Sequence, residues 1–485
     1  MKLTTIPFTR FDPGNELARA YLCEPERVLP LFGADYRDPR SLRPLVDRQG
    51  SRERPRWGDL LAQYNQEVGG SVENARRLDE GFCVVSGQQV GLLFGPAYTT
   101  YKLLTTINTA RVLEVELGVP VVPLFWVESE DHDWEEVNRF FWKGRRYRIE
   151  GEVAAGTPVA RIDIASEPFL AEMRELLGET GEAWDLVRPE KNIARWHLRN
   201  LARLVAGQGV VFVEPALLRD PMRPLAEEIA RRPEILDASL QRETGYPRPL
   251  APSKGAYLFH AQAPRRRLER GAPVPEAWSA DVASRVVLQN AAFPVLAAVC
   301  GPSEIAYWSQ LRGAHEAFDV PMPAVMPRDA ATLVEEGIAR DAARLGLDLE
   351  AVVRGHASAP AREGGDPVAL RLRRLAREAN ELSRALDEGL LDLPKNTDRH
   401  FARTVTRLET DLEKLARRLD DARAEMAGAG RRRYDRVLTE LRPRGVPQER
   451  SHSLFPYLLR HGPGLAAGLL DSFDPYEIGH YLVRL

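Results

Sequence analysis

Short apolar runs alternate with longer amphipathic segments over the first three quarters of the chain, which predicts strands followed by helices. An apolar run at Phe82–Val85 leads into a glycine-rich segment and then into a helical pattern over Ala97–Leu117. Gly118 suits the end of this helix because glycine tolerates positive φ. The continuous apolar run Val119–Val127 that follows fits a strand buried on both faces. Together these segments predict one β-α-β unit.

The same order of elements recurs later in the chain. The apolar run Phe293–Cys300 is followed by Gly301-Pro302-Ser303-Glu304, a helical pattern and the apolar segment Ala324–Met326. A further candidate strand at Gly209–Val213 precedes a helix near residues 223–230. Repeated strand-helix-strand units of this kind predict a doubly wound α/β sheet.

Beyond Gly364 the composition changes to Leu, Ala, Arg and Glu, and the apolar spacing becomes heptad. This spacing predicts a coiled coil, with a breaker at Leu393–Asn396 that allows an antiparallel hairpin. A seam left exposed would favour a homodimer, whereas the alternative is a helical bundle packed on the core. The stripe comprises Leu372, Leu375, Ala379, Leu382, Leu386, Phe401, Val405, Leu408, Leu412, Leu415, Leu419, Ala422 and Met426.

The predicted domain organisation follows from these patterns. We expect an α/β core over residues 1–365, with inserted subdomains at about 140–190 and 235–285. A coiled-coil domain is expected over 366–441, and residues 442–485 are expected to return to the core.

Composition narrows the class of protein. The 485 residues carry 67 Lys and Arg against 70 Asp and Glu, a net charge of -3, so no global basic field argues for nucleic acid. No apolar run reaches the ~20 residues of a membrane helix, and Met1–Arg10 lacks the pattern of a secretory signal. Three cysteines without CxxC spacing suggest neither a disulfide framework nor a zinc site. We therefore expect a folded cytoplasmic protein without a membrane partner.

The first segment with candidate chemistry is the glycine-rich one between strand and helix. Backbone N–H groups near a helix N-terminus attract phosphates and carboxylates. The segment matches neither the P-loop nor the G-x-G-x-x-G pattern, and ordinary capping or a solvated face is the alternative for each residue. The candidate ligand-binding residues are Ser86, Gly87, Gln88, Gln89, Gly91, Gly95, Tyr98 and Lys102.

A run of ionisable residues, Glu128–Glu136, follows the buried strand. Ligands of open α/β sheets bind beyond the carboxyl ends of the strands, so the run is placed as an active site would be. His132 could act as general base with an acidic neighbour, or the carboxylates could bind a divalent ion. The alternative is a helix N-terminus with acids facing its dipole. The catalytic candidates are Glu130, Asp131, His132 and Asp133.

The second glycine segment should face the same sheet edge. Its candidates are Gly301, Ser303, Glu304, Tyr307 and Gln310, together with Arg328 after the following strand. The arginine fork suits a ligand carboxylate. For Arg265–Arg267 a solvated loop and an anion contact remain open.

These motifs together resemble the bacillithiol biosynthesis cysteine-adding enzyme family, the cysteine ligases. The resemblance spans nearly the whole chain and rests on Ser86–Pro96, Phe125-Trp126 with Glu130–Asp133, Gly301–Trp308 and Pro447–Arg450. It implies a Rossmann-like core with inserted subdomains and a coiled coil that forms a homodimer. It also implies condensation of L-cysteine with glucosaminyl malate to give bacillithiol.

Amide formation in water needs an activated carboxylate, which points to ATP, with ADP or AMP as product. We expect Gly87, Gly91 and Gly95 to line a phosphate or malate pocket, Lys102 or Arg328 to neutralise charge, and His132 with Asp131 or Asp133 to deprotonate the amine. The need for a metal stays open. The alternatives are a nucleotidyltransferase-like enzyme on another substrate and a non-catalytic nucleotide-binding scaffold.

Overall fold

The computed structural model describes residues 1–142, 145–149, 153–164, 190–262, 264–357, 367–387, 398–424, 429–477 and 479–485. The chain divides into two compact units. The first comprises Met1–Leu333 with Val446–Arg484, and the second comprises Val334–Gly445 with Leu485. Among the described residues, no helix is both long and apolar enough to cross a membrane.

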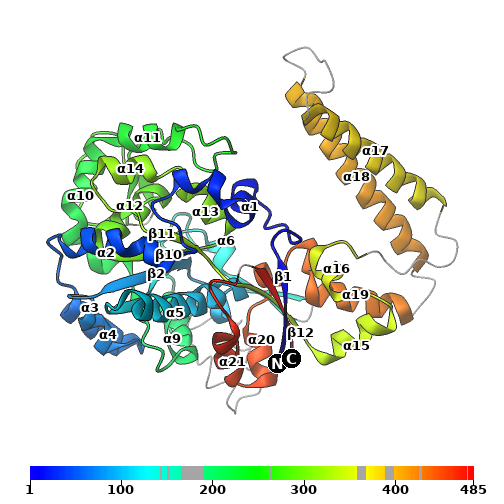
Figure 1. Cartoon of the computed structure of the whole chain (residues 1–485), viewed down its shortest axis with the longest axis horizontal. Coiled ribbons are helices and arrows are strands. Elements are labelled where there is room, and N and C mark those ends of the chain that lie inside the picture. The colour runs from blue at the N-terminus through cyan, green and yellow to red at the C-terminus, as the bar shows by residue number, and fades with distance from the viewer. Residues whose placement is uncertain are drawn as a thin grey trace. The chain divides into compact units, whose positions relative to one another are not determined.

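The first unit is built on a parallel sheet of five strands, of which β2, β10 and β11 are labelled in Figure 1. The order is β11-β10-β2-β3-β6, and every neighbouring pair is parallel. The chain enters in the middle at β2, extends one way through β3 and β6, and then crosses to the other side for β10 and β11. This reversal between β2 and β10 confirms the predicted doubly wound α/β core. The strands are β2 (Phe82–Gln89), β3 (Val121–Glu128), β6 (Val211–Val213), β10 (Val295–Cys300) and β11 (Ala324–Pro327).

Helices that connect and cover these strands supply the rest of the core. The predicted helix after β2 is α5 (Ala97–Leu117), which packs across β2, β3 and β10 and ends at Gly118 with φ +65°. A capping box at Asp281 starts α12 (Val282–Ala292). The others in this unit are α1 (Glu16–Cys23), α2 (Arg43–Gly50), α3 (Gly58–Val68), α4 (Val72–Arg77), α6 (Trp134–Val137), α9 (Ile193–Leu204), α10 (Arg219–Arg231), α11 (Pro233–Gln241), α13 (Pro302–Trp308), α14 (Arg312–Ala317), α20 (Phe455–His461) and α21 (Gly464–Ser472).

A second sheet joins the two ends of the chain. Strand β1 (Lys2–Pro7) pairs antiparallel with β13 (Gly479–Arg484), and β12 (Ala330–Val334) completes the order β1-β13-β12. The sequence pattern predicted none of these strands. Each is short, and its pairing partners lie far away in the sequence, so local periodicity carries little signal for them.

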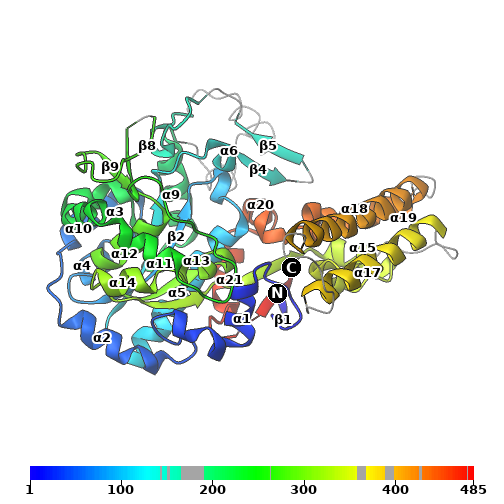
Figure 2. The same cartoon turned by 90° about the horizontal axis from the view of Figure 1, so that it is seen from above.

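Two small sheets occupy the predicted insertions. Strands β4 (Arg139–Trp142) and β5 (Arg145–Arg148) form an antiparallel hairpin, seen beside α6 in Figure 2. Strands β7 (Leu258–His260), β8 (Arg266–Arg267) and β9 (Trp278–Ala280) form a three-stranded antiparallel sheet. Most of the predicted insertion at 140–190 lies outside the described residues, which exclude 165–189.

The second unit is helical. Helices α17 (Pro367–Asp387) and α18 (Asp398–Ala424) lie side by side (Figure 1) and run antiparallel, because Arg373 pairs with Asp420 and Asn380 with Glu409. Helix α19 (Ala429–Leu441) pairs with α15 (Glu336–Arg344) through Arg436 and Asp341, 3.1 Å apart. Helix α16 (Leu349–Arg354) also belongs to this unit. The heptad pattern predicts a coiled-coil domain from residue 366, whereas the compact unit that contains it begins at Val334.

The predicted heptad stripe is only partly buried, and the side chains of its members Leu386, Ala422 and Met426 lie outside the described residues. The hairpin buries the small residues Ala376, Ala379, Val405 and Ala416. Four leucines of the same stripe are exposed. They are Leu375, Leu382, Leu408 and Leu415.

Candidate functional site

A cavity of about 670 Å³ opens at the carboxyl ends of the parallel strands. Gly87, Gln88 and Gln89 reach it from the end of β2, Glu128 from β3, and Gly301 directly after β10. Strands β2 and β10 are the pair between which the strand order reverses. The cavity therefore lies at the topological switch point, where open α/β sheets bind their ligands.

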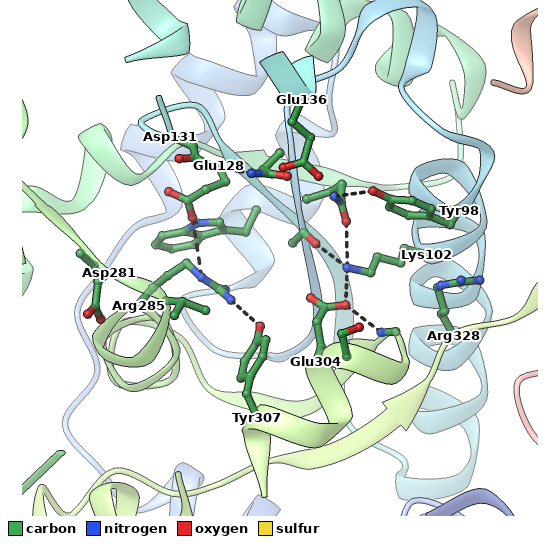
Figure 3. A pocket seen from close by; sticks show the side chains of 18 of the residues that line it. Tyr98, Lys102, Glu128, Asp131, Glu136, Asp281, Arg285, Glu304, Tyr307 and Arg328 are labelled. Atoms are coloured by element: carbon green, nitrogen blue, oxygen red, sulfur yellow. Dashed lines mark hydrogen bonds and ion pairs between the residues drawn. The ribbon is translucent and has the colours of Figure 1, made fainter. Parts of the chain in front are cut away.

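Lys102 on α5 forms the centre of one cavity wall (Figure 3). Its ammonium donates to the Gly87 carbonyl at 2.9 Å and to Gln88 Oε1 at 3.0 Å, and it lies 2.5 Å from Glu304 Oε2. The same Glu304 oxygen accepts the Gly301 N–H at 2.7 Å. Three acceptors match the three N–H bonds of a lysine, so Lys102 ties β2 to α13.

Arg285 on α12 occupies a second wall (Figure 3). It donates to the Tyr307 hydroxyl at 3.0 Å, and its Nε lies 3.7 Å from Glu128 Oε2. Glu128 also accepts from Trp126 Nε1 at 3.1 Å. Burial raises the pKa of Glu128, while Arg285 acts to lower it. Arg285 was not among the residues predicted from the sequence, where its signal would have been that it is the one charged residue in Val282–Ala292.

Arg328 and Tyr98 form a third wall. The Arg328 guanidinium lies 5.5 Å from the centre of the Tyr98 ring and is paired with the Glu449 carboxylate. The Tyr98 hydroxyl accepts from Gln88 Nε2 at 3.3 Å. Burial, with the charge of Glu136, raises the pKa of Tyr98 to about 12, so the phenol stays protonated. Arg450 lines the cavity as well.

The sheet of β7, β8 and β9 contributes cations to the cavity. The guanidinium carbons of Arg265 and Arg267 lie 4.1 and 4.4 Å from the centre of the Phe259 ring. Arg267 pairs with Asp281 at 2.8 Å, and Arg265 Nη1 lies 3.6 Å from Asp131 Oδ1. The three arginines of the run differ in their position, and whether any of them contacts an anion stays a prediction. Arg265 and Arg267 line the cavity, whereas Arg266 is exposed outside it.

Most of the predicted ligand-binding residues meet in this one cavity, although they come from distant parts of the sequence. Each of them lies at the end of a strand, directly after a strand, or on the helix that follows a strand. The predicted residues that line the cavity are Gly87, Gln88, Gln89, Tyr98, Lys102, Asp131, Gly301, Ser303, Glu304, Tyr307 and Arg328.

Four predicted binding residues lie outside the lining, each engaged in the fold. Ser86 Oγ accepts from Thr106 at 2.8 Å, and the Gly91 carbonyl lies 2.9 Å from His197 Nδ1. Gly95 adopts φ +69°, a turn conformation that favours glycine. Gln310 donates to the carbonyls of Leu240 and Leu250 at 2.8 and 2.9 Å, because α13 ends at Trp308 and Gln310 no longer shares a face with Glu304.

Only Asp131 of the four predicted catalytic residues lines the cavity, where it accepts from Gln89. Glu130 does not line the cavity, and it is buried and paired with Arg219. Asp133 caps α6 by accepting the Glu136 N–H at 3.2 Å, the alternative considered for an acid at a helix start. The His132 side chain is 41% exposed, 3.5 Å from Asp131 and 3.3 Å from Arg265.

Glu128 and Glu136 are cavity acids that the sequence analysis named only as ends of the acidic run. The described residues contain no group of three or more His, Cys, Asp or Glu that could hold a metal ion.

Family models cover both units of the chain. Residues 1–247 and 256–329 match the model "Bacillithiol biosynthesis BshC, N-terminal Rossmann-like domain", and residues 331–485 match "Bacillithiol biosynthesis BshC, C-terminal coiled-coil domain". The chain belongs to the BshC family. This membership agrees with the resemblance found in the sequence and with the Rossmann-like order of the parallel sheet.

Curated BshC relatives match the chain over most of its length. One from Symbiobacterium thermophilum is 30% identical over 99% of both chains. Relatives from Anoxybacillus flavithermus and Geobacillus thermodenitrificans are 29% and 28% identical and cover 87% and 94% of this chain, and 88% and 95% of their own. All three are named "Putative cysteine ligase BshC". A solved structure from Campylobacter jejuni, described as a "putative arginyl t-RNA synthetase", covers 85% of this chain and 97% of its own at TM-score 0.25 and 10% identity, too low to support an argument.

Proposed function

We propose that this chain is a ligase that joins the carboxyl group of L-cysteine to the amine of glucosaminyl malate, giving bacillithiol. The names of the BshC relatives support a cysteine ligase. The observation that carries the proposal is the mixed charge of the cavity at the switch point. Arg265, Arg328 and Arg450 suit the carboxylates of the substrates, and Glu128 and Asp131 suit their amines.

The condensation requires an activated carboxylate, and we propose that ATP supplies the activation. Attack of the cysteine carboxylate on a phosphorus atom of ATP forms an acyl phosphate and ADP, or an acyl adenylate and pyrophosphate. The glucosamine amine then displaces phosphate or AMP, and one proton leaves the nitrogen as the amide forms. The cationic cavity walls would stabilise the charge that develops on the leaving group.

A general base must take that proton, and two residues compete for the role. His132 has Asp131 beside it but stands outside the cavity lining. Glu128 lines the cavity, and burial raises its pKa toward the range useful for a base. We propose His132 as the base, acting together with Asp131, and Glu128 as the competing assignment.

Parallel substitutions separate the two assignments. His132→Gln should lower kcat by about 100-fold with little change in KM, because the proton-transfer step is affected more than binding. Since the His132 side chain is 41% exposed, the variant should have the same Tm as the wild type. Full activity of His132→Gln together with a loss in Glu128→Gln would transfer the role to Glu128.

One assay tests the reaction itself. Purified protein is incubated with L-cysteine, glucosaminyl malate, ATP and Mg²⁺, and the thiol product, ADP, AMP and pyrophosphate are followed by mass spectrometry. We expect a new thiol of bacillithiol mass in step with nucleotide cleavage, and none without ATP. Pyrophosphate release without consumption of cysteine would favour a nucleotidyltransferase instead. Nucleotide binding without any product would favour a scaffold.

We also propose that the chain forms a homodimer through its coiled coil. On α17 the exposed residues Val368, Leu375 and Leu382 recur every seven positions, and on α18 Leu408 and Leu415 do the same. A second apolar stripe with heptad spacing suits packing against another coiled coil. A second copy of this chain offers the same stripe in self-complementary form.

A further inference from the structure

The segment Pro447–Arg450 follows the return of the chain from the helical unit and contacts β12 in the first unit. The chain leaves the first unit after Leu333 and re-enters it at Val446. The Gln448 side chain accepts the Leu333 N–H at 2.7 Å and donates to the Leu333 carbonyl at 2.9 Å. Its amide therefore pairs with the backbone as a neighbouring strand would, which fixes the next residue, Glu449, in place.

Glu449 makes two buried contacts from that fixed position. One carboxylate oxygen pairs with Arg328 Nη2, and the other accepts the Ala331 N–H at 3.0 Å. Both side chains of the ion pair are only 5% exposed. Although burial acts to raise it, Arg328 holds the pKa of Glu449 below its usual range. Two donors thus face an ionised carboxylate, which has only acceptors to offer.

The Arg328 guanidinium makes two hydrogen-bonded contacts within the protein and also lines the cavity. It donates to the Asp329 carbonyl at 2.8 Å and to Glu449, and the guanidinium lies over the Tyr98 ring. A guanidinium carries five N–H donors, so these two contacts leave three. Arg328 lines the cavity together with Arg450, the next residue after Glu449.

We propose that Glu449 is a positioning residue, which holds the Arg328 guanidinium against Tyr98 so that its remaining donors face an anionic group of the bound substrate. This inference rests on the proposed function, because the proposed substrates are carboxylates and phosphates. The recognised group is an oxyanion, either a malate carboxylate or an ATP phosphate. Without Glu449, Arg328 would be a buried cation free to turn away from that oxyanion.

A double-mutant cycle tests whether Glu449 acts through Arg328. The amide of Glu449→Gln has one acceptor oxygen, and its NH₂ group can only donate, so it cannot accept from both Arg328 and Ala331 in the same geometry. Arg328→Gln removes the proposed oxyanion contact itself. In the double variant the two amides can pair with each other, and no buried charge is left unpaired.

The measurements are the Kd of malate and of ATP by calorimetry, KM and kcat for glucosaminyl malate and for ATP, and Tm. We expect Glu449→Gln and Arg328→Gln each to weaken one of the two ligands by about tenfold, mainly in Kd and KM. The double variant should bind no worse than Arg328→Gln alone, while its Tm exceeds that of both single variants. A loss confined to malate identifies the carboxylate as the recognised group, and a loss confined to ATP identifies the phosphate.

Several results would overturn the proposal. Unchanged Kd and KM in Glu449→Gln with a lower Tm would mean that the ion pair only stabilises the fold. Additive losses in the double variant, or no binding of either probe by the wild type, would also refute it. The variants could weaken binding as predicted for the cycle while the wild type makes no bacillithiol. That result would refute the proposed function and leave the positioning role of Glu449 intact. Glu114→Gln, which breaks the half-exposed Arg77–Glu114 pair outside the cavity, is the matched control.

Discussion

At the scale of single residues, cavity side chains of one charge differ in what they can offer a ligand. Lys102 gives its three N–H bonds to Gly87, Gln88 and Glu304, so its charge organises the protein. Arg328 keeps donors beyond those used by Glu449 and Asp329. A buried charge needs hydrogen-bond or ion-pair partners within the protein. The number of N–H donors left after those contacts therefore decides which cation can bind a ligand.

Asp329 has a buried carboxyl group whose effect on the free energy of unfolding can be tested. It is 5% exposed, its Oδ2 lies 2.8 Å from Thr105 Oγ1, and burial raises its pKa to about 7. Between about pH 4 and 7 the unfolded chain releases this proton while the folded chain keeps it. The free energy of unfolding should therefore fall as pH rises through this window, by up to about 1.4 kcal/mol per pH unit from this group.

Urea unfolding of the wild type and Asp329→Asn at pH 5, 6 and 7 measures this contribution. The asparagine cannot ionise, so the fall in unfolding free energy with pH should be smaller in the variant. Asp59→Asn, at a fully exposed side chain, should follow the wild type. Parallel pH profiles of wild type and Asp329→Asn would show that Asp329 is already ionised in the folded state at pH 5.

At the scale of elements, a carboxamide side chain pairs with the backbone of the outermost described strand in the five-stranded parallel sheet and in the β1-β13-β12 sheet. Asn65 on α3 accepts the Phe212 N–H at 2.8 Å and donates to the Phe212 carbonyl at 3.0 Å, on the edge strand β6. Gln448 does the same for Leu333 on β12. An amide carries both a donor and an acceptor, so each side chain satisfies the backbone N–H and carbonyl of the one buried edge residue that it contacts.

Asn65→Ala should lower the free energy of unfolding by about 3 kcal/mol, because it leaves a buried N–H and a buried carbonyl of Phe212 without partners. Chemical denaturation measures the change. Gln66→Ala, on the exposed face of the same helix, should change stability by less than about 0.5 kcal/mol. An equal, small effect of both substitutions would mean that water replaces the Asn65 contacts.

At the scale of the whole molecule, the two units carry different proposed functions, which are ligand binding and dimerisation. The parallel sheet and its insertions build the cavity, and the helical hairpin carries the exposed leucine stripes. Within the hairpin Ala376 and Ala416 are buried, while Leu375 and Leu415 are exposed and available for the proposed dimer contact. Burial of such a stripe in a dimer would remove apolar area from water.

Light scattering after size exclusion tests this assembly. The wild type should have twice the 54.4 kDa mass of one chain, and the double variant Leu408→Glu with Leu415→Glu should elute as the monomer, because charges would replace the apolar stripe. Thr410→Glu adds a charge to the same helix outside the stripe and should leave the dimer unchanged. A wild type that is monomeric at micromolar concentration, or a double variant that stays dimeric, would contradict the proposal.

The sequence by itself determined the repeated strand-helix units, the parallel core and the placement of Gly87–Gln89 and Gly301–Glu304 at strand ends. Apolar periodicity and glycine positions are local signals, and the carboxyl ends of parallel strands necessarily share one edge. Gly91 and Gly95 carried the same signal as Gly87, but the folded chain uses them within the loop.

Only the tertiary structure decided which charges meet. Arg285 and Glu128 come from different strand-helix units, and Arg328 pairs with Glu449 across 121 positions of sequence. The pairing of β1 with β13 also joins opposite ends of the chain. Such contacts depend on where the chain crosses from one strand to the next. Neighbouring residues in the sequence carry no signal for these crossings, because a paired arginine or glutamate has the same local sequence pattern as many unpaired ones.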